Sequence, residues 1–412
     1  MTSGASGTHV SDAAASGFGV QSVFQPIVSL PEGAVVGFEA LARWPTLGNP
    51  APHEVFARAA VTGTLEQLDR TCIDSALETA LARNLPAGTL LLLNCEPMSG
   101  YVDRHCDRML ARAGDQFRVV FELTERSLLK SPRALLRKVA KLRDDGFGIA
   151  LDDVGAHPDS LALLDVICPD VIKLDLHLIQ VTMGDDQARV LAAVLAHQER
   201  TGSVLLAEGI ESEEHLEQAL ALGATLGQGY RYGRAESLTG KTSVDWSPPP
   251  MKHPVRSDGR SPFDVVAGRA AVRTARKAVL IPFSRHIETQ AAHATDPPMM
   301  LASLQRAENF SGSTRRRYRD IAATSPMVAV FGRGLDGDLG RGIRGVELDA
   351  DDPLCAEWVV LMLGPHHAAA LVAREQNFAA SLSDDDRRFD MSITYDRVLV
   401  TVAARNLLER VR

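Results

Sequence analysis

Short apolar runs alternate with longer amphipathic stretches over residues 23–230, and this alternation constrains the fold more than any other feature. The runs are Val23–Val28, Val35–Leu41, Leu90–Leu93, Val119–Phe121, Ile149–Leu151, Val171–Leu174 and Val204–Ala207. Helical patterns lie between most of them, such as Leu65–Arg83, Ala134–Arg143 and Ala188–Glu199. This repetition predicts parallel strands joined by crossover helices, in a (β/α) barrel or a doubly wound sheet. Because seven or eight strand candidates fall within about 220 residues, the barrel is favoured.

A proline-rich stretch ends the alternation and predicts a linker over residues 239–261. It contains Ser247–Pro250 and little apolar content, a composition that favours extended chain. We therefore expect the barrel over residues 21–238 and an independent, smaller α+β domain over residues 262–412. Residues 1–20 are rich in Ser, Gly and Ala and are expected to be disordered.

Charge, cysteine content and hydropathy limit the partners and the compartment. A net charge of −8 does not favour non-specific binding to nucleic acid, so no DNA partner is expected. The five cysteines form no CxxC pair, which argues against a disulfide framework or a zinc site and predicts a cytoplasmic protein. The sequence shows no secretory signal pattern and no apolar run of about 18 residues, so no membrane span is expected.

Polar side chains lie within or directly after the apolar runs of the expected barrel. These residues are Glu39, Asn94, Glu122, Asp152, Asp153, Lys173, Glu208 and Gln228. The C-terminal ends of barrel strands converge on the mouth where active sites are built. Any one of these residues alone would be interpreted as a solvated strand end or a turn. Their joint placement instead predicts that five carboxylates crowd one bowl.

Crowded carboxylates repel each other unless protons or cations compensate their charge. Oxygen ligands with one asparagine and no Cys or His select Mg²⁺ or Mn²⁺ rather than zinc. The adjacent pair Asp152-Asp153 suits two ions, because one carboxylate can bridge them while the next binds the second. Two such ions, about 3.5–4 Å apart, are a familiar arrangement for phosphodiester hydrolysis.

The same residues lie in motifs that resemble the EAL-domain family of cyclic di-GMP phosphodiesterases over about residues 20–238. The motifs are Phe24-Gln25-Pro26-Ile27-Val28, Gly37-Phe38-Glu39-Ala40-Leu41-Ala42-Arg43-Trp44, Asn94, Glu122-Leu123-Thr124-Glu125, Asp152-Asp153-Val154-Gly155, Lys173-Leu174-Asp175, Ala207-Glu208-Gly209-Ile210-Glu211 and Gln228-Gly229-Tyr230. The resemblance implies a modified TIM (β/α)8 barrel whose first strand runs antiparallel to the others. It also implies hydrolysis of cyclic di-GMP to linear pGpG, and a homodimer formed through the barrel.

The resemblance assigns roles to individual positions. One metal ion would be held by Glu39, Asn94, Glu122 and Asp152, and the second by Asp152, Asp153 and Glu208. Lys173 would help to activate the attacking water, and Glu208, Glu211 and Gln228 would complete the catalytic shell. The substrate would contact Gln25, Leu41 and Arg43. Glu125 would anchor the loop that follows the paired aspartates.

That loop, residues 154–160, departs from the family pattern. Val154 stands where the family has Phe, and His157-Pro158-Asp159 replaces a glycine-rich stretch. His157 is interpreted as an incidental loop residue, with a substitute metal ligand as the alternative. The altered loop keeps a second hypothesis open, in which the chain is a catalytically weak or inactive cyclic di-GMP receptor that acts through protein contacts. A third, a protein–protein adaptor without either activity, is disfavoured by the intact ligand set.

The C-terminal segment resembles the DICT sensory domain. The matching stretches are Thr314-Arg315-Arg316-Arg317-Tyr318, Val328-Ala329-Val330-Phe331-Gly332, Arg344-Gly345-Val346, Asp352-Pro353-Leu354, Glu357-Trp358, Gly364-Pro365-His366 and Thr394-Tyr395-Asp396-Arg397. The resemblance implies regulation of the barrel by a signal that the pattern does not name. Phe263–Arg276 predicts a helix and Ala278–Ile281 a strand, while Arg315–Arg317 predicts a solvated helix face rather than an anion site.

Overall fold

The computed structural model describes residues 11–411 apart from residues 84, 102, 125–128, 157, 182–183, 239–259, 336 and 377–386. The chain divides into two compact units. The first comprises Met1–Leu128, Arg137–His157 and Pro169–Met251, and the second comprises Leu129–Leu136, Pro158–Cys168 and Lys252–Arg412. Most of the expected linker, residues 239–259, lies outside the described residues. The domain boundaries drawn from the sequence therefore stay predictions.

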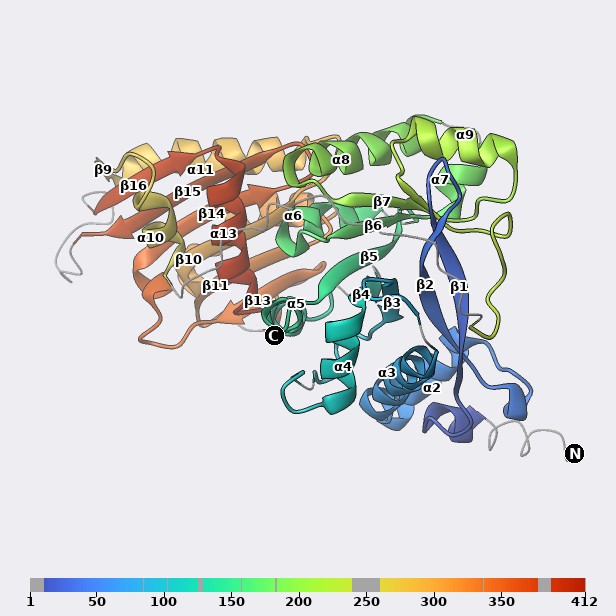
Figure 1. Ribbon diagram of the computed structural model, residues 1–412. Coiled ribbons are helices and arrows are strands. Elements are labelled where there is room, and N and C mark those ends of the chain that lie inside the picture. Colours follow the sequence, from blue (N-terminus) through green and yellow to red (C-terminus); the bar gives the residue numbers. More distant parts are fainter. Residues whose placement is uncertain are drawn as a thin grey trace, which may run out of the picture. The chain divides into compact units, whose positions relative to one another are not determined.

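Eight strands close into the barrel of the first unit (Figure 1). They are β1 (Gln21–Ser29), β2 (Val35–Arg43), β3 (Leu90–Asn94), β4 (Arg118–Thr124), β5 (Gly148–Val154), β6 (Val171–Leu174), β7 (Val204–Ala207) and β8 (Leu226–Gly227). β1 pairs antiparallel with both β2 and β8, and all the other neighbours pair in parallel. The expected modified barrel with an antiparallel first strand is confirmed.

Helices connect the parallel strands, as right-handed crossovers require. They are α2 (Pro52–Thr62), α3 (Leu65–Ala82), α4 (Arg108–Gln116), α5 (Pro132–Asp144), α6 (Leu164–Ile167), α7 (Leu176–Gln180), α8 (Asp185–Thr201) and α9 (Glu213–Ala221), with short 3₁₀ turns η1 (Pro45–Leu47) and η3 (Pro158–Leu163). Several begin at a side-chain cap that accepts backbone N–H donors. The caps include Asp107 at α4, Asp175 at α7 and Ser212 at α9.

The chain before β1 is folded from residue 11 onward. Residues 11–15 are helical, and Ala14 and Ala15 pack against Trp44 and Leu68 in a buried cluster. Small side chains allow this close packing, because alanine loses no rotamer freedom when it is buried. The expectation of disorder over residues 1–20 is therefore wrong for residues 11–20. Residues 1–10 lie outside the described part of the chain.

The second unit contains one mixed eight-stranded sheet in the order β12-β13-β11-β10-β14-β15-β16-β9 (Figure 1). The strands are β9 (Arg273–Arg276), β10 (Met299–Arg306), β11 (Val328–Arg333), β12 (Gly337–Asp338), β13 (Ile343–Glu347), β14 (Glu357–Leu363), β15 (Ala368–Glu375) and β16 (Arg388–Thr394). The helices are α10 (Pro262–Ala267), α11 (Lys277–Ala292), α12 (Gly312–Ile321) and α13 (Arg397–Leu408), with 3₁₀ turns η4 (Ala307–Asn309) and η5 (Pro353–Ala356). A smaller sheet-and-helix unit at the C-terminus was expected and is confirmed.

Two local predictions in this unit are wrong. Ala278–Ile281 lies in α11, where Leu280, Ser284, Ile287 and Ala291 are buried at helical spacing. The segment 263–276, expected to be one helix, divides into α10 and β9. Side chains of α11 and α12 form a buried core with one face of the sheet.

No helix among the described residues is long and apolar enough to cross a membrane.

Candidate metal-binding site at the mouth of the barrel

The strand register decides which polar side chains enter the mouth of the barrel. The interior of the barrel is filled by apolar residues that include Leu92, Val120, Ala150, Val171, Leu206 and Leu226. Side chains two positions apart on a strand point to the same face. Two positions beyond these six come Asn94, Glu122, Asp152, Lys173, Glu208 and Gln228. The inward face of each strand thus changes from apolar to polar as it reaches the mouth.

Lys173 lies at the centre of the acidic cluster. Its Nζ is 2.8 Å from Asp152 Oδ1, 2.9 Å from Glu208 Oε1, 3.0 Å from Glu122 Oε1 and 3.4 Å from Glu39 Oε1. The lysine side chain is 1% exposed and that of Glu122 is fully buried. One ammonium therefore compensates four carboxyl groups that lie within or directly after four different strands. We call these five residues the Lys173 cluster.

The surroundings of each group shift its pKa in a definite direction. Burial would lower the pKa of Lys173, but the charges of Asp152 and the three glutamates raise it well above its ordinary value, so the side chain is an ammonium. Burial and the charge of Glu39 raise the pKa of Glu122 well above its usual range, and burial raises that of Glu208 to about 8. For Glu39 the effect of burial is outweighed by Lys173 and by hydrogen bonds, which lower its pKa.

Two amide side chains hold Glu39 in place. Gln228 Nε2 donates to Glu39 Oε2 at 2.6 Å, and Asn94 Nδ2 approaches Glu39 Oε1 at 3.4 Å. Gln228 is 97% buried, and its Oε1 has no hydrogen-bond partner among the described residues. Glu39 therefore has a fixed orientation in the cluster, which is the condition for a precise ligand or catalytic group.

A second set of carboxylates overlaps the Lys173 cluster and shares Asp152 and Glu208 with it. Carboxylate oxygens of Asp152, Asp153 and Glu208 lie within 4.8 Å of one another. Asp153 has a φ of 57°, in the left-handed region that aspartate enters more readily than most residues. This backbone conformation lets two consecutive aspartates serve the same site, although neighbouring side chains on a regular strand point to opposite faces.

The residues present fit divalent cations. Both carboxylate oxygens of Glu122 and Oδ1 of Asp152 are buried without a hydrogen-bond partner in the described chain. The ammonium of Lys173 forms ion pairs with Glu122 Oε1 at 3.0 Å and with Asp152 Oδ1 at 2.8 Å. Buried carboxylate oxygens in this state are suited to a hard cation, and the donor set contains only oxygen ligands.

Comparison with known proteins agrees with this geometry. Residues 10–235, more than half of the 412-residue chain, match the family described as EAL domain. The chain belongs to the EAL-domain family. Residues 266–376 match the family described as Sensory domain in DIguanylate Cyclases and Two-component system. Both resemblances proposed from sequence motifs are confirmed.

Relatives of the EAL barrel carry informative names. RocR of Pseudomonas aeruginosa, named a cyclic di-GMP phosphodiesterase, is 30% identical over 224 residues, which cover 52% of this chain and 57% of RocR. PdeG of Escherichia coli, named a probable cyclic di-GMP phosphodiesterase, is 27% identical over 238 residues, covering 56% of this chain and 47% of PdeG. The structure of Klebsiella pneumoniae BlrP1 with manganese and cyclic di-GMP is 28% identical, with a TM-score of 0.46, and covers 54% of this chain and 58% of that one. The chain thus spans about half the length of RocR and of PdeG.

The other expected site residues of the EAL barrel lie outside the Lys173 cluster. Gln25 is directly opposite Glu39 in the β1–β2 pairing, so the two share a face, and Gln25 Nε2 donates to the carbonyl of Gly233 at 3.3 Å. Leu41 and Arg43 follow Glu39 at two-residue spacing on β2 and are half-buried. Glu211 is exposed. Glu125 and His157 lie outside the described residues.

A second buried polar network was missed from the sequence. Asp69 on α3 and Lys138 on α5 are both buried, and their side-chain atoms lie 3.8 Å apart. The ammonium of Lys138 also donates to Ser99 Oγ at 2.7 Å, and Asp69 Oδ1 accepts from the Glu96 N–H at 2.9 Å. These contacts fix the chain that follows Asn94. A possible signal was Asp69 itself, which directly follows the core residue Leu68 in an otherwise amphipathic helix.

Replacing Lys138 by methionine is expected to destabilise the EAL barrel. The substitution keeps the volume but leaves the buried Asp69 carboxylate without its cation, which costs about 3 kcal/mol of unfolding free energy. Urea denaturation followed by circular dichroism would measure the loss. Lys141→Met is the matched control, because Lys141 is exposed on the same helix. Equal stability of the two variants would contradict a stabilising role for the Asp69–Lys138 pair.

Proposed function

We propose that the EAL barrel of this chain hydrolyses one phosphodiester bond of cyclic di-GMP to give linear pGpG. The observation that carries the proposal is the Lys173 cluster, in which four carboxyl groups from four different strands lie within 3.4 Å of one ammonium. The names of the relatives supply the substrate. Five of the six expected metal-binding side chains are acidic and would bind divalent cations. The reaction needs such cations to offset the charge of the phosphate.

The two groups of carboxylates would hold two ions of Mg²⁺ or Mn²⁺. Glu39, Asn94, Glu122 and Asp152 would bind the first, and Asp152, Asp153 and Glu208 would bind the second. When bound, such ions supply Lewis-acid chemistry that makes water more acidic and offsets charge on the phosphate. Carboxyls now held towards the protonated form would release protons as the ions bind.

The chain's own residues would position the reactants. The Lys173 ammonium can donate a hydrogen bond to the attacking water and favour its deprotonation, but it cannot itself accept the proton. Gln228 would keep Glu39 oriented through the 2.6 Å hydrogen bond. Arg43 would contact a substrate phosphate through its guanidinium, and Gln25 and Leu41 would contact the substrate from the first two strands.

A chromatographic product assay tests the proposal. The purified full chain is expected to convert cyclic di-GMP to pGpG with Mn²⁺ or Mg²⁺, and to show little turnover with Ca²⁺, whose looser coordination polarises water weakly. Glu217→Ala, a change at an exposed acid of α9, should leave the rate unchanged. Strong hydrolysis with Ca²⁺ would contradict the proposed chemistry.

The altered loop after Asp153 supports a second candidate function. If the wild-type chain binds cyclic di-GMP but forms no product with either Mn²⁺ or Mg²⁺, it is a receptor that acts through protein contacts. Regulation of the barrel by the C-terminal sensory domain is expected for either function. A homodimer is also expected for either function, and light scattering of the full chain would test it.

A further inference from the structure

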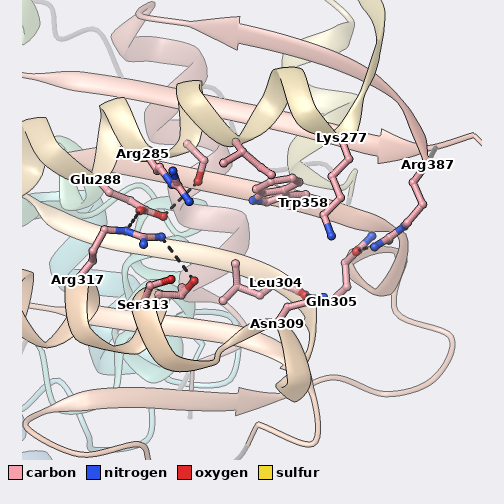
Figure 2. Close-up of a pocket in the computed structure, with 13 residues that line it drawn as sticks. Lys277, Arg285, Glu288, Leu304, Gln305, Asn309, Ser313, Arg317, Trp358 and Arg387 are labelled. Carbon is pink, nitrogen blue, oxygen red and sulfur yellow. Dashed lines mark hydrogen bonds and ion pairs between the residues drawn. The ribbon is translucent and has the colours of Figure 1, made fainter. Parts of the chain in front are cut away.

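A cavity of about 190 Å³ opens in the second unit, among residues of α11, α12, β10 and β14 and the residue before β16 (Figure 2). In Figure 2, Trp358 lies between two groups of polar side chains. One group contains Arg285, Glu288 and Arg317, and the other contains Lys277, Gln305 and Arg387. The cavity is therefore a polar pocket with one aromatic wall.

Two buried hydrogen-bond donors in the pocket lack acceptors. Trp358 Nε1 and Gln305 Nε2 are both buried, and neither has a partner in the described chain. Gln305 is 94% buried, and its Oε1 accepts from Arg387 at 2.8 Å, which fixes the amide so that Nε2 remains the unused donor. Buried donors of this kind are rare in folded proteins and call for an acceptor.

The backbone places Gln305 in the pocket by means of a bulge. The register of β10 with β11 shifts between Ser303 and Gln305, and Gln305 has a φ of 68°. On a regular strand Leu304 and Gln305 would point to opposite faces, yet both line the cavity. A bulge that re-aims a side chain, and a non-glycine residue held in the left-handed region, are features that cluster at ligand sites.

The charge of the lining is positive. Four lining side chains are cationic (Lys277, Arg285, Arg317 and Arg387) and one, Glu288, is anionic. Glu288 is 98% buried, and both of its carboxylate oxygens are used, by Ser284 Oγ at 3.1 Å and Arg317 Nε at 2.6 Å. Arg387 forms a bidentate pair with Glu375. With those two pairs counted as neutral, Arg285 still adds one positive charge to the lining.

The size of the cavity limits the ligand. A cavity of about 150 Å³ accommodates benzene, so about 190 Å³ holds one ring with a small substituent. A flavin, a bilin or cyclic di-GMP would extend beyond it. We propose that this pocket binds a small organic monoanion that carries one planar ring, with the ring against Trp358 and the anionic group held by the cationic lining.

Calorimetric titration of the full chain with benzoate tests the proposal. Benzoate is expected to bind saturably, and benzamide, its neutral isostere, about tenfold more weakly, because a charge-assisted contact is lost. Arg285→Ala should weaken benzoate binding by about the same factor. Arg285 is exposed, so this variant is expected to fold. Arg316→Ala, at an exposed residue of α12 outside the lining, is the matched control and should bind as the wild type does.

Three outcomes would overturn the proposal. The first is the absence of saturable benzoate binding at millimolar concentrations. The second is equal affinity for benzoate and benzamide, which would remove the role of charge. The third is tighter binding of inorganic phosphate than of benzoate, which would remove the role of the ring. Because the readout is binding in the second unit, the result is independent of the phosphodiesterase assay.

Discussion

Lys173→Met is expected to lower the unfolding free energy of the metal-free EAL barrel by about 3–5 kcal/mol. The ammonium of Lys173 contacts four carboxyl groups and is almost fully buried. Methionine fills a similar volume, but it leaves Glu39 and its neighbours without a compensating charge in a site from which water is largely excluded. Urea denaturation in the presence of a chelator, followed by circular dichroism, would measure the loss.

Divalent cations should partly reverse this loss of stability. Mn²⁺ bound to the folded state only would stabilise it by mass action, and it would supply the positive charge that the variant lacks. Lys141→Met controls for the removal of a lysine, because that side chain is exposed. If Lys173→Met were as stable as the wild type in chelator, the cluster would not depend on the ammonium for its charge balance. If Mn²⁺ stabilised neither protein, the carboxylates would not form a cation site.

The barrel site could be predicted because side chains two positions apart on a strand point to the same face, and this two-residue repeat can be read from the sequence. Apolar residues such as Ala150 and Leu206 fill the interior, and the residues two positions later, Asp152 and Glu208, inherit the same inward face. Strand ends of a closed barrel converge, so the site follows from the pattern. The sequence placed Lys173 at the mouth as well, but it could not show that one ammonium contacts four carboxyl groups. That depends on side-chain reach across the barrel.

The second unit shows where local pattern fails. The short apolar run Ala278–Ile281 ahead of Pro282 resembles a strand, yet it forms the first turns of α11. Tertiary packing of Leu280 and Ile287 into the core overrides the local signal, even though Pro282 lies inside the helix and removes one backbone hydrogen bond from it. A six-residue α10 and a four-residue β9 are too short for a periodic pattern to separate them.

The pocket of the second unit was not predictable for a different reason. Its lining comes from four distant segments, and Gln305 enters it only through a bulge and a left-handed residue. Neither feature leaves a signal in the sequence, since glutamine is not a residue that favours φ > 0. The arginine run Arg315–Arg317 was interpreted as a solvated face. Arg315 and Arg316 are exposed, but Arg317 is half-buried and paired with Glu288.

Glu39→Ala is expected to reduce the rate of pGpG formation by about 10²–10³-fold or more, as removal of a preorganised electrostatic group at a reacting centre does. The substitution removes a proposed metal ligand, a contact of Lys173 and the acceptor of Gln228 at once. Gln228→Ala should cost less, about 10–100-fold, because Gln228 acts by orienting Glu39 rather than by binding an ion itself. Initial rates from chromatography at saturating Mn²⁺ would give both values.

The two variants should also differ in how they depend on metal concentration. Without its hydrogen bond to Gln228, Glu39 keeps its charge but loses its fixed orientation, so Gln228→Ala should need more Mn²⁺ and recover part of its rate as the concentration rises. Glu39→Ala should show no such recovery, since the ligand itself is missing. Glu217→Ala serves as the control for loss of an acidic side chain. A Glu39→Ala variant that regained the wild-type rate at high Mn²⁺ would show that Glu39 is dispensable, and the ion assigned to it would then have to be held by Asn94, Glu122 and Asp152.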